Sequence, residues 1–344
     1  MLGRISDCGP ENKKLSSYLQ DMSEGGLTRI RLQNRCLELS ILPEAGGKII
    51  DLVDRTTRRN WLWHNPYISP VAGRHDAEFR SEQDTGGWDE ILLSMTPGEI
   101  ESANGHAWQV PDHGDVIGRQ WLVEHLDADP QGDAICSMSV AGTTIPYEFK
   151  RSIRLMHDQP KVAITYFVSN RADAPIPCYW CAHALFAVEA GAEIGLSGNP
   201  TIRIYDPQTQ GLCLSHDEHR WPSLHLNDGT SRDLSRSFAV NASSPGFASK
   251  IFMPSAECGA VQLRMPGTEE RLSISFDPDE LPWLGMWINN RGWSGCGPEP
   301  YCNLGIEPAT SPYDCVGEAI RNDAVGWLRP GEVRNWSLLV ELLQ

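Results

Sequence analysis

The sequence predicts an all-β fold, a large antiparallel β-sandwich with few short helices, and three observations lead to this prediction. Hydrophobic and polar residues alternate with a period of two along many short segments, as they do in strands with one buried face. No segment carries a long helical stripe of hydrophobic residues. The 344-residue chain contains 24 prolines and 31 glycines, which separate these segments as turn residues separate the strands of a sandwich.

The individual strands follow from the same alternation. Near the N-terminus we predict strands at 28–33 (TRIRLQ), 36–42 (CLELSIL) and 48–54 (KIIDLVD), with a turn at PEAGG between the last two. A hairpin is predicted where MHDQP separates two alternating segments, 147–155 (YEFKRSIRL) and 161–170 (KVAITYFVSN). Further strands are predicted at 271–277 (RLSISFD), 284–289 (LGMWIN) and 334–343 (RNWSLLVELL).

The chain shows no internal repeat, no low-complexity block and no shift in composition that would mark a linker. Large sandwiches often exceed the usual length of a domain. We therefore expect residues 27–344 to form one domain and residues 1–26 to form an N-terminal extension.

Composition and charge exclude several classes of partner. The net charge of −16 argues against nucleic acid and against an anionic membrane surface as partners. No run of 18 apolar residues exists, so no membrane span is expected. The N-terminus has no apolar segment typical of a signal peptide, so we expect a cytoplasmic protein with reduced thiols.

The ten cysteines include one pair with metal-ligand spacing, Cys178 and Cys181 in CYWC. No second pair of this kind follows, and zinc sites of this type need four ligands. We therefore expect neither a metal nor another cofactor.

Three residues are candidates for acid–base chemistry. Glu307 in LGIEPA ends an apolar strand, where a carboxylate is costly to bury unless it is paired or faces a pocket. His183 lies inside the apolar run WCAHALFAV, where a buried imidazole needs a hydrogen-bond partner. His113 precedes a glycine in PDHGDVIGRQW, which also contains Arg119. Taken alone, each histidine is more typical of a structural residue, and Glu307 is equally compatible with a salt bridge or a capping role.

A second group of residues is typical of sugar binding. The segment FDPDELPWLGMWINNRGW combines three tryptophans with polar side chains, and DTGGWDEILLS adds one more tryptophan. A pyranose stacks its C–H faces on aromatic rings, and its hydroxyl groups bind fixed donors and acceptors. The candidate sugar-binding residues are Trp88, Asp89, Asp277, Trp287 and Asn289, together with Arg119.

Four stretches, in this order, resemble the galactose mutarotase-like superfamily, which includes aldose 1-epimerases and hexose-6-phosphate epimerases. They are LPEAGGKIIDLVDRTTRRNWLW, PDHGDVIGRQW, CAHALFAVEAGAEI and LGIEPATSPYD, and the resemblance extends from about residue 27 to residue 344. Ala184 stands where the family usually has proline. Ile117 stands where the phosphate epimerases have arginine, which argues against a phosphorylated substrate.

The resemblance implies a sandwich of the mutarotase type and an isomerase that interconverts the anomers of a monosaccharide without a cofactor. Glu307 matches the family's catalytic base, His183 its catalytic acid and His113 a histidine that steadies the sugar ring. Two alternatives stay open. The chain could be a catalytically silent sugar-binding protein, since a fold does not fix a function. It could also be a carbohydrate lyase or hydrolase in which Asp89 or Asp277 pairs with Glu307.

Overall fold

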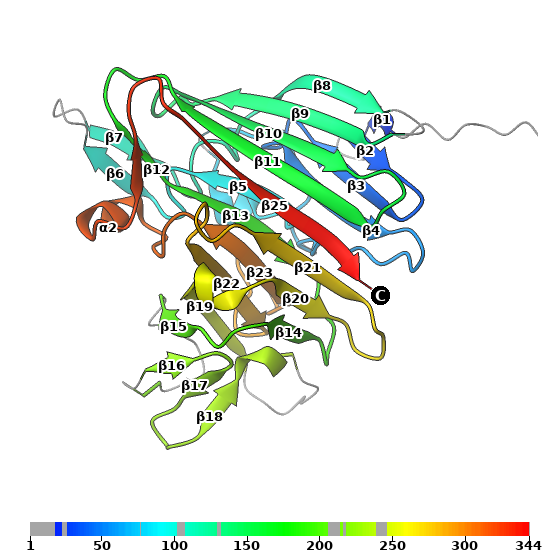
Figure 1. Ribbon diagram of the computed structural model, residues 1–344, viewed down its shortest axis with the longest axis vertical. Helices are drawn as coiled ribbons and strands as arrows, with labels where there is room; N and C mark the ends of the chain where they lie inside the picture. The colour runs from blue at the N-terminus through cyan, green and yellow to red at the C-terminus, as the bar shows by residue number, and fades with distance from the viewer. Residues whose placement is uncertain are drawn as a thin grey trace, which may run out of the picture.

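The computed structural model describes residues 18–22, 26–75, 77–101, 107–128, 132–205, 214–215, 218–238 and 246–343 (Figure 1). Within these residues the chain forms one 13-stranded and one 8-stranded antiparallel sheet, so the predicted all-β fold is confirmed. None of the helices in this part of the chain has the length and apolar character needed to cross a membrane.

The 13-stranded sheet combines strands from both ends of the chain. Its order is β1 (Tyr18–Met22), β2 (Thr28–Gln33), β3 (Leu37–Leu42), β4 (Lys48–Asp54), β5 (Trp88–Leu92), β13 (Trp180–Phe186), β23 (Cys302–Ala309), β22 (Trp283–Asn290), β19 (Phe247–Pro254), β15 (Thr201–Ile204), β16 (His219–Arg220), β17 (Ser223–His225) and β18 (Ser231–Asp233). Strand β13 therefore joins an N-terminal half of the sheet to a C-terminal half.

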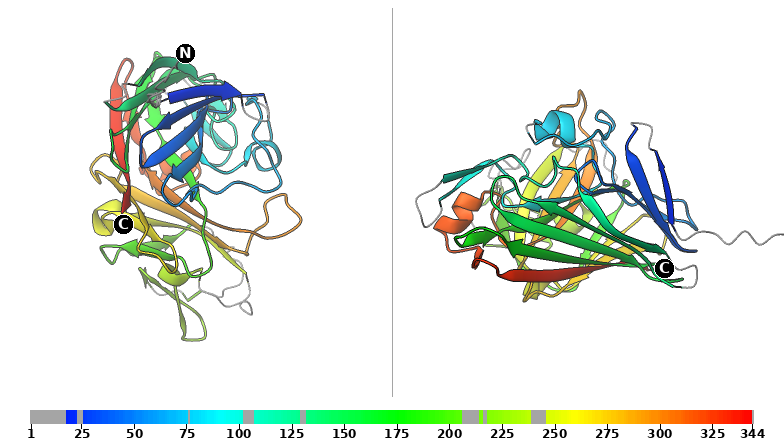
Figure 2. Two further views of the ribbon diagram at one scale, coloured as in Figure 1. Left: turned by 90° about the vertical axis from the view of Figure 1, so that its right-hand side faces the viewer. Right: turned by 90° about the horizontal axis from the view of Figure 1, so that it is seen from above.

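The 8-stranded sheet packs over the middle of the larger one (Figures 1 and 2). Its order is β14 (Glu193–Leu196), β20 (Val261–Arg264), β21 (Arg271–Phe276), β25 (Val333–Leu343), β11 (Lys161–Asn170), β10 (Tyr147–Leu155), β9 (Ala134–Ala141) and β8 (Leu122–Ala128). The C-terminal strand β25 lies inside this sheet and pairs with both β11 and β21.

The other elements described are short. Two small ladders pair β6 (Gly98–Glu101) with β7 (Ala107–Val110) and β12 (Ile176–Cys178) with β24 (Gly326–Leu328). The helical segments are α1 (Ser255–Cys258), α2 (Val316–Arg321), the π-helical turn η1 (Phe79–Gln83) and the 3-10 turn η2 (Leu234–Arg236). In the view from above in Figure 2, η1 lies on the side of the large sheet that faces away from the 8-stranded sheet.

The strands predicted from alternation agree with the structure to within one residue at each end. The predicted hairpin is confirmed, because β10 and β11 pair in register from Tyr147 opposite Asn170 to Leu155 opposite Val162. Strand β1 pairs with β2 at the edge of the large sheet. The division of the chain at residue 26 stays a prediction.

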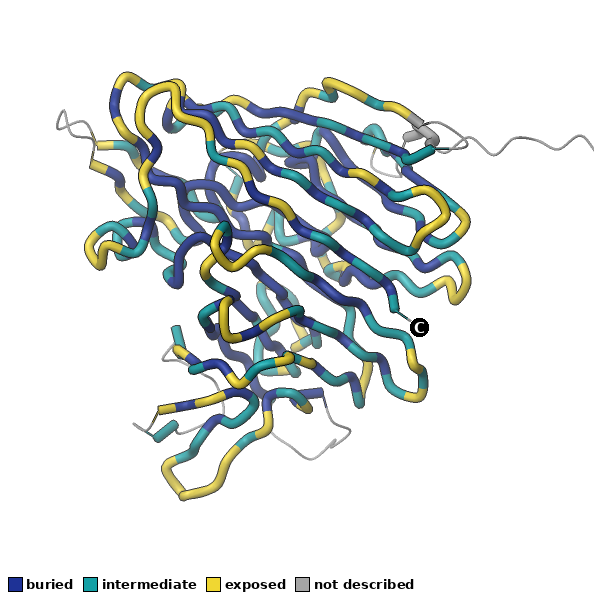
Figure 3. Tube along the Cα trace, in the orientation of Figure 1, coloured by how far each residue is buried: buried dark blue, intermediate teal, exposed yellow. Residues whose placement is uncertain are grey.

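Hydrophobic side chains from both sheets fill the space between them, and the buried stretches of the chain follow the strands (Figure 3). One ion pair crosses this core. Arg151 on β10 donates to Glu90 on β5 at 2.9 Å, and both side chains are fully buried. Glu90 also accepts hydrogen bonds from Tyr166 at 3.0 Å and from Trp180 at 3.1 Å, so its buried charge is satisfied on several sides.

Alternation along the central strands decides which residues face the second sheet. On β23, Leu304 and Ile306 face the core, whereas Asn303 and Glu307 line a pocket on the opposite face. On β5, Glu90 faces the core and its neighbour Asp89 faces the other way. The outer face of strands β13, β23, β22 and β19 is therefore the floor of a separate polar region.

Candidate active site

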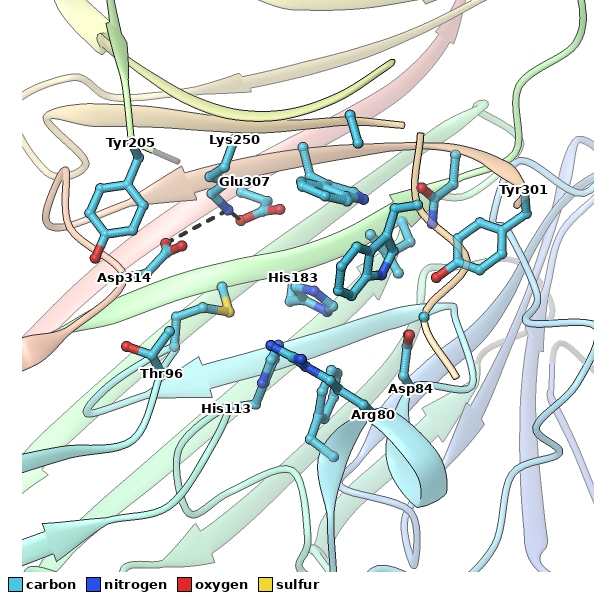
Figure 4. A pocket seen from close by; sticks show the side chains of 18 of the residues that line it. Arg80, Asp84, Thr96, His113, His183, Tyr205, Lys250, Tyr301, Glu307 and Asp314 are labelled. Atoms are coloured by element: carbon cyan, nitrogen blue, oxygen red, sulfur yellow. Dashed lines mark hydrogen bonds and ion pairs between the residues drawn. The ribbon is translucent and has the colours of Figure 1, made fainter. Parts of the chain in front are cut away.

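A pocket of about 660 Å³ opens on this outer face, a volume within the range of small-molecule sites. Its floor is formed by strands β13, β19, β22 and β23, and η1 contributes to one wall. Aromatic and titratable side chains dominate its lining: Phe79, Tyr205, Trp287, Trp293 and Tyr301 with Arg80, Asp84, His113, His183, Lys250, Glu307, Asp314 and Glu318 (Figure 4). Flat apolar faces and hydrogen-bonding groups thus surround one cavity.

Glu307 lies on the floor of the pocket, and its side chain is only 1% exposed. It stands opposite Gly285 of β22, two residues along its own strand from Gly305. A Cβ atom at residue 305 would come within 2.5 Å of the Oε1 atom of Glu307. The glycine therefore leaves the space in which the carboxylate lies.

The carboxylate of Glu307 is paired with a buried lysine. Lys250 on β19 donates from Nζ to Oε2 of Glu307, and its side chain is 8% exposed. The same ammonium lies 3.9 Å from the Oδ1 atom of Asp314 (Figure 4). Burial alone would lower the pKa of Lys250, but the charges of Glu307 and Asp314 outweigh it and raise that pKa. Burial raises the pKa of Asp314 to about 6, with Lys250 opposing this shift.

His183 on β13 lies between the Lys250–Glu307 pair and His113 in the close view of the pocket (Figure 4). Its Nδ1 atom is buried and has no hydrogen-bond partner within the described protein. Burial lowers the pKa of His183 well below its ordinary value, and the nearby positive groups His113, Lys250 and Lys48 act in the same direction. This environment favours the neutral imidazole, and the residue lines the pocket.

His113 stands beside His183 with 5.3 Å between the ring centroids. Its ring stacks on Phe79 of η1, and its Nδ1 atom lies 3.0 Å from the carboxylate of Asp112. The following glycine is required by packing, since a Cβ atom at Gly114 would meet the carbonyl oxygen of Leu92 at 2.2 Å. The His-Gly pair thus brings the backbone against β5 while the imidazole reaches the pocket.

The other end of the pocket carries different groups. Arg80 lies over the ring of Trp293 at 5.5 Å, and Tyr301 and Asp84 stand nearby (Figure 4). Burial raises the pKa of Asp84 to about 6, against the opposing charges of Lys48 and His113. This end therefore offers one cation, one weakly acidic carboxyl group and two aromatic rings.

Four of the residues selected from the sequence line the pocket: His113, His183, Trp287 and Glu307. Trp88 does not, because alternation on β5 turns it into the core, where it is 2% exposed and packs edge-on against Phe186. Asp89 faces the outer side of the sheet but is covered by an ion pair with Lys48 and is only 3% exposed.

Arg119, Asp277 and Asn289 also lie outside the pocket lining. Arg119 donates to Thr143 at 2.6 Å, and Asp277 is an exposed turn residue that accepts from the backbone of Asp279. Asn289 is fully buried, and its side chain donates to the carbonyl of Trp293 at 3.1 Å and accepts from the Trp293 amide at 3.1 Å. Its role is to hold the turn that carries Trp293.

Sequence reasoning missed Lys250, Asp314, Asp84 and Arg80. Lys250 had a usable signal, because a lysine inside the apolar strand FASKIFMP is as unusual as Glu307 in its own strand. The others lie in loops or in η1, where no periodicity indicates direction.

The part of the chain that the structure describes holds no cluster of three or more histidine, cysteine, aspartate or glutamate side chains arranged for a metal ion. Cys178 and Cys181 are both buried free thiols. Burial raises the pKa of Cys178 to about 11, so this thiol stays protonated at neutral pH.

The fold places the chain among known structures. No protein-family model matches it, and no curated protein matches it in sequence. A galactose mutarotase-like protein from Clostridium acetobutylicum aligns with 95% of this chain and 98% of its own, at 15% identity and a TM-score of 0.64.

Two further structures agree with this result. The Slr1438 protein from Synechocystis sp. PCC 6803 aligns with 94% of this chain and 99% of its own, at 16% identity and a TM-score of 0.65. A protein from Klebsiella pneumoniae described as a candidate aldose 1-epimerase aligns with 95% of this chain and 83% of its own, at 15% identity and a TM-score of 0.68. The chain therefore has the galactose mutarotase-like fold, as the sequence resemblance implied.

Proposed function

We propose that the protein is an aldose 1-epimerase that interconverts the anomers of a monosaccharide. The observation that carries the proposal is the meeting of Glu307, His183 and His113 with Trp287 and Trp293 around one pocket. A sugar ring needs this combination of apolar faces and fixed hydrogen-bonding groups. The candidate aldose 1-epimerase of similar fold supports it further.

The chemistry requires only proton transfers. Glu307 takes the proton from the anomeric hydroxyl O1–H while the ring oxygen O5 receives a proton. The C1–O5 bond breaks, the resulting aldehyde rotates about the C1–C2 bond, and O5 attacks the other face of C1 as both proton transfers run in reverse. A positioned acid or base contributes about 10²–10⁴-fold to such a reaction.

The role expected of His183 changes. The sequence resemblance made it the acid, which calls for a protonated ring, whereas burial lowers the pKa of its imidazole well below the ordinary value and disfavours that form. We propose that the imidazole of His183, which lines the pocket, binds a hydroxyl group of the sugar. His113, stacked on Phe79, holds the opposite edge of the ring.

The hydrolase alternative loses both partners that the sequence suggested for Glu307. Asp277 lies at the end of a strand of the other sheet, and Asp89 is occupied by Lys48. Glycosidases require two carboxylates on either side of the scissile bond. Neither Asp277 nor Asp89 is placed to form such a pair with Glu307.

Saturation-transfer NMR on a panel of free aldoses tests the proposal, because it reports anomer exchange directly. We expect the purified protein to accelerate exchange of at least one aldose above the uncatalysed rate. Cleavage of a disaccharide, or binding of aldoses with no faster exchange, would overturn the proposal in favour of a hydrolase or of a silent binding protein respectively.

A further inference from the structure

Lys250 lies on the floor of the pocket, and the mechanism above does not use it. Lysine is almost never buried without a partner, and this one is surrounded by two carboxylates inside a ligand-sized cavity. Its ammonium bonds to Glu307 and faces the same cavity as His183. A group so placed is within reach of any substrate that Glu307 touches.

The register of the sheet explains how two residues on non-adjacent strands come into contact. Strand β22 separates Lys250 on β19 from Glu307 on β23, and the position opposite Glu307 on β22 is Gly285. A Cβ atom there would lie 3.0 Å from the ring of Phe252 and 3.4 Å from the Cβ atom of Glu307. Lys250 reaches Glu307 across β22 beside Phe252, whose ring centroid lies 5.3 Å from the Nζ atom of the lysine.

The geometry of a hemiacetal suits two groups in contact. The hydroxyl O1 that loses a proton and the ring oxygen O5 that gains one are bound to the same carbon. An acid and a base on opposite sides of the ring are therefore unnecessary. A hydrogen-bonded lysine and glutamate can reach both oxygens from one side.

We propose that Lys250 is the proton donor to the ring oxygen and the acid partner of Glu307, a role that rests on the proposed epimerase function. In ring opening, Glu307 takes the proton of O1–H, Lys250 gives a proton to O5, and the C1–O5 bond breaks. In ring closure after rotation, Lys250 takes the proton back from O5–H and Glu307 returns its proton to O1. Both residues end the cycle in their starting states.

Electrostatics couples the two transfers. The charge of Glu307 strengthens the hold of Lys250 on its proton, so neutralising that carboxylate with the proton from O1 weakens this hold when the transfer to O5 begins. The other titratable groups facing Lys250 are Asp314, on the loop after β23, and Cys181 and His183 on β13. Asp314 keeps the ammonium charged in the resting enzyme.

The first experiment compares Lys250→Met with Lys48→Met. Lys48 is a matched control, since it is a buried lysine paired with a buried aspartate but lies outside the pocket lining. We expect Lys250→Met to lower kcat for anomer exchange about 10²–10⁴-fold, the usual contribution of a positioned acid. Folded Lys48→Met should keep a rate close to that of the wild type. A similar loss in both variants, or no loss in Lys250→Met, would overturn the proposal.

The second experiment separates proton donation from charge pairing. In Lys250→Ala, added primary amines should restore exchange, with rates that depend on the pKa of the amine. Lys250→Arg keeps the positive charge but holds its proton too tightly to donate it, so this variant should stay slow. Full activity of Lys250→Arg, or rescue that is independent of amine pKa, would show that Lys250 only positions Glu307.

The pH profile gives a third measure. A protonated His183 as acid would make the rate fall as the pH rises from the acid side to neutrality, whereas Lys250 as acid keeps the rate level from about pH 7 to about pH 9. A wild-type protein without any anomer exchange would refute the epimerase function itself. An active wild type with an active Lys250→Met variant would refute only the role of the lysine.

Discussion

Replacing Glu307 by glutamine tests the buried ion pair through stability as well as through activity. The amide has almost the same shape as the carboxylate, and sequence reasoning alone would expect an intact fold. In the structure the change leaves the ammonium of Lys250, 8% exposed, with Asp314 at 3.9 Å as its remaining counter-charge. A buried charge that loses its partner is strongly destabilising.

The expected loss in the free energy of unfolding follows from these contacts. Breaking a buried pair costs about 3–5 kcal/mol, and the second carboxylate places Glu307→Gln at the lower end, about 3 kcal/mol. Lys250→Met should cost a similar amount, because it strands Glu307. The double variant should lose far less than the sum, with a coupling energy of about 2–3 kcal/mol. At an unfolding entropy of about 2.1 cal/mol/K per residue, 3 kcal/mol corresponds to a decrease in Tm of about 4 °C.

Chemical denaturation at pH 7 of the wild type, the two single variants and the double variant measures this cycle. Anomer exchange measured on the same samples should be lost in all three variants, so stability and rate report separate properties of one pair. Additive losses of stability, with no coupling between the two sites, would refute the interpretation of Lys250 and Glu307 as a mutually dependent pair.

Three further predictions concern pH, His183 and metals. Burial raises the folded-state pKa of Asp314 to about 6, so its contribution to stability is present below pH 3.8 and is lost as the pH rises through about 6. In urea denaturation the free energy of unfolding of Asp314→Asn should therefore exceed that of the wild type by about 2–3 kcal/mol at pH 8 and equal it near pH 4. Equal stability of the two proteins at both pH values would contradict this reasoning. His183→Asn should slow exchange about 10–100-fold, because a lost hydrogen bond to substrate costs about 1–3 kcal/mol. The shape of the pH–rate profile between pH 6 and 9 should stay unchanged. A shift in the acidic limb of this profile would show that His183 is the acid. Exhaustive dialysis against EDTA should leave the exchange rate unchanged, because the proposed steps are proton transfers, and a loss that only zinc restores would point back to Cys178 and Cys181.

The strands could be predicted from the sequence because alternation is a local signal. Every strand named from it agrees with the structure, including the hairpin of β10 and β11. His183 and Glu307 were found for a related reason: a polar residue in an apolar strand is visible without knowledge of its neighbours. Lys250 carries the same signal in FASKIFMP, so it was predictable and was overlooked.

The sequence could not show which face of the sheet each side chain points to. Trp88 and Asp89 are consecutive on β5, so only one of them faces the outer side of the sheet, and the register with β13 decides which. Asn289 lies on the same face as Trp287 but is covered by the turn at Trp293. The partnership of Lys250 with Glu307 joins residues 57 positions apart on two strands that β22 separates. Such pairings are set by tertiary contacts and leave no local pattern.

The place of β25 inside the 8-stranded sheet has a consequence for how the protein comes to be folded. This strand lies between β11 and β21 and pairs with both of them. The two halves of that sheet therefore cannot join until residues 333–343 have left the ribosome. Contacts that span so much of the chain make folding slow and expose unpaired strand edges while synthesis continues. We expect a nascent chain lacking β25 to need chaperone protection. In refolding experiments, the proposed anomer exchange should return only after β25 has become protected against hydrogen exchange.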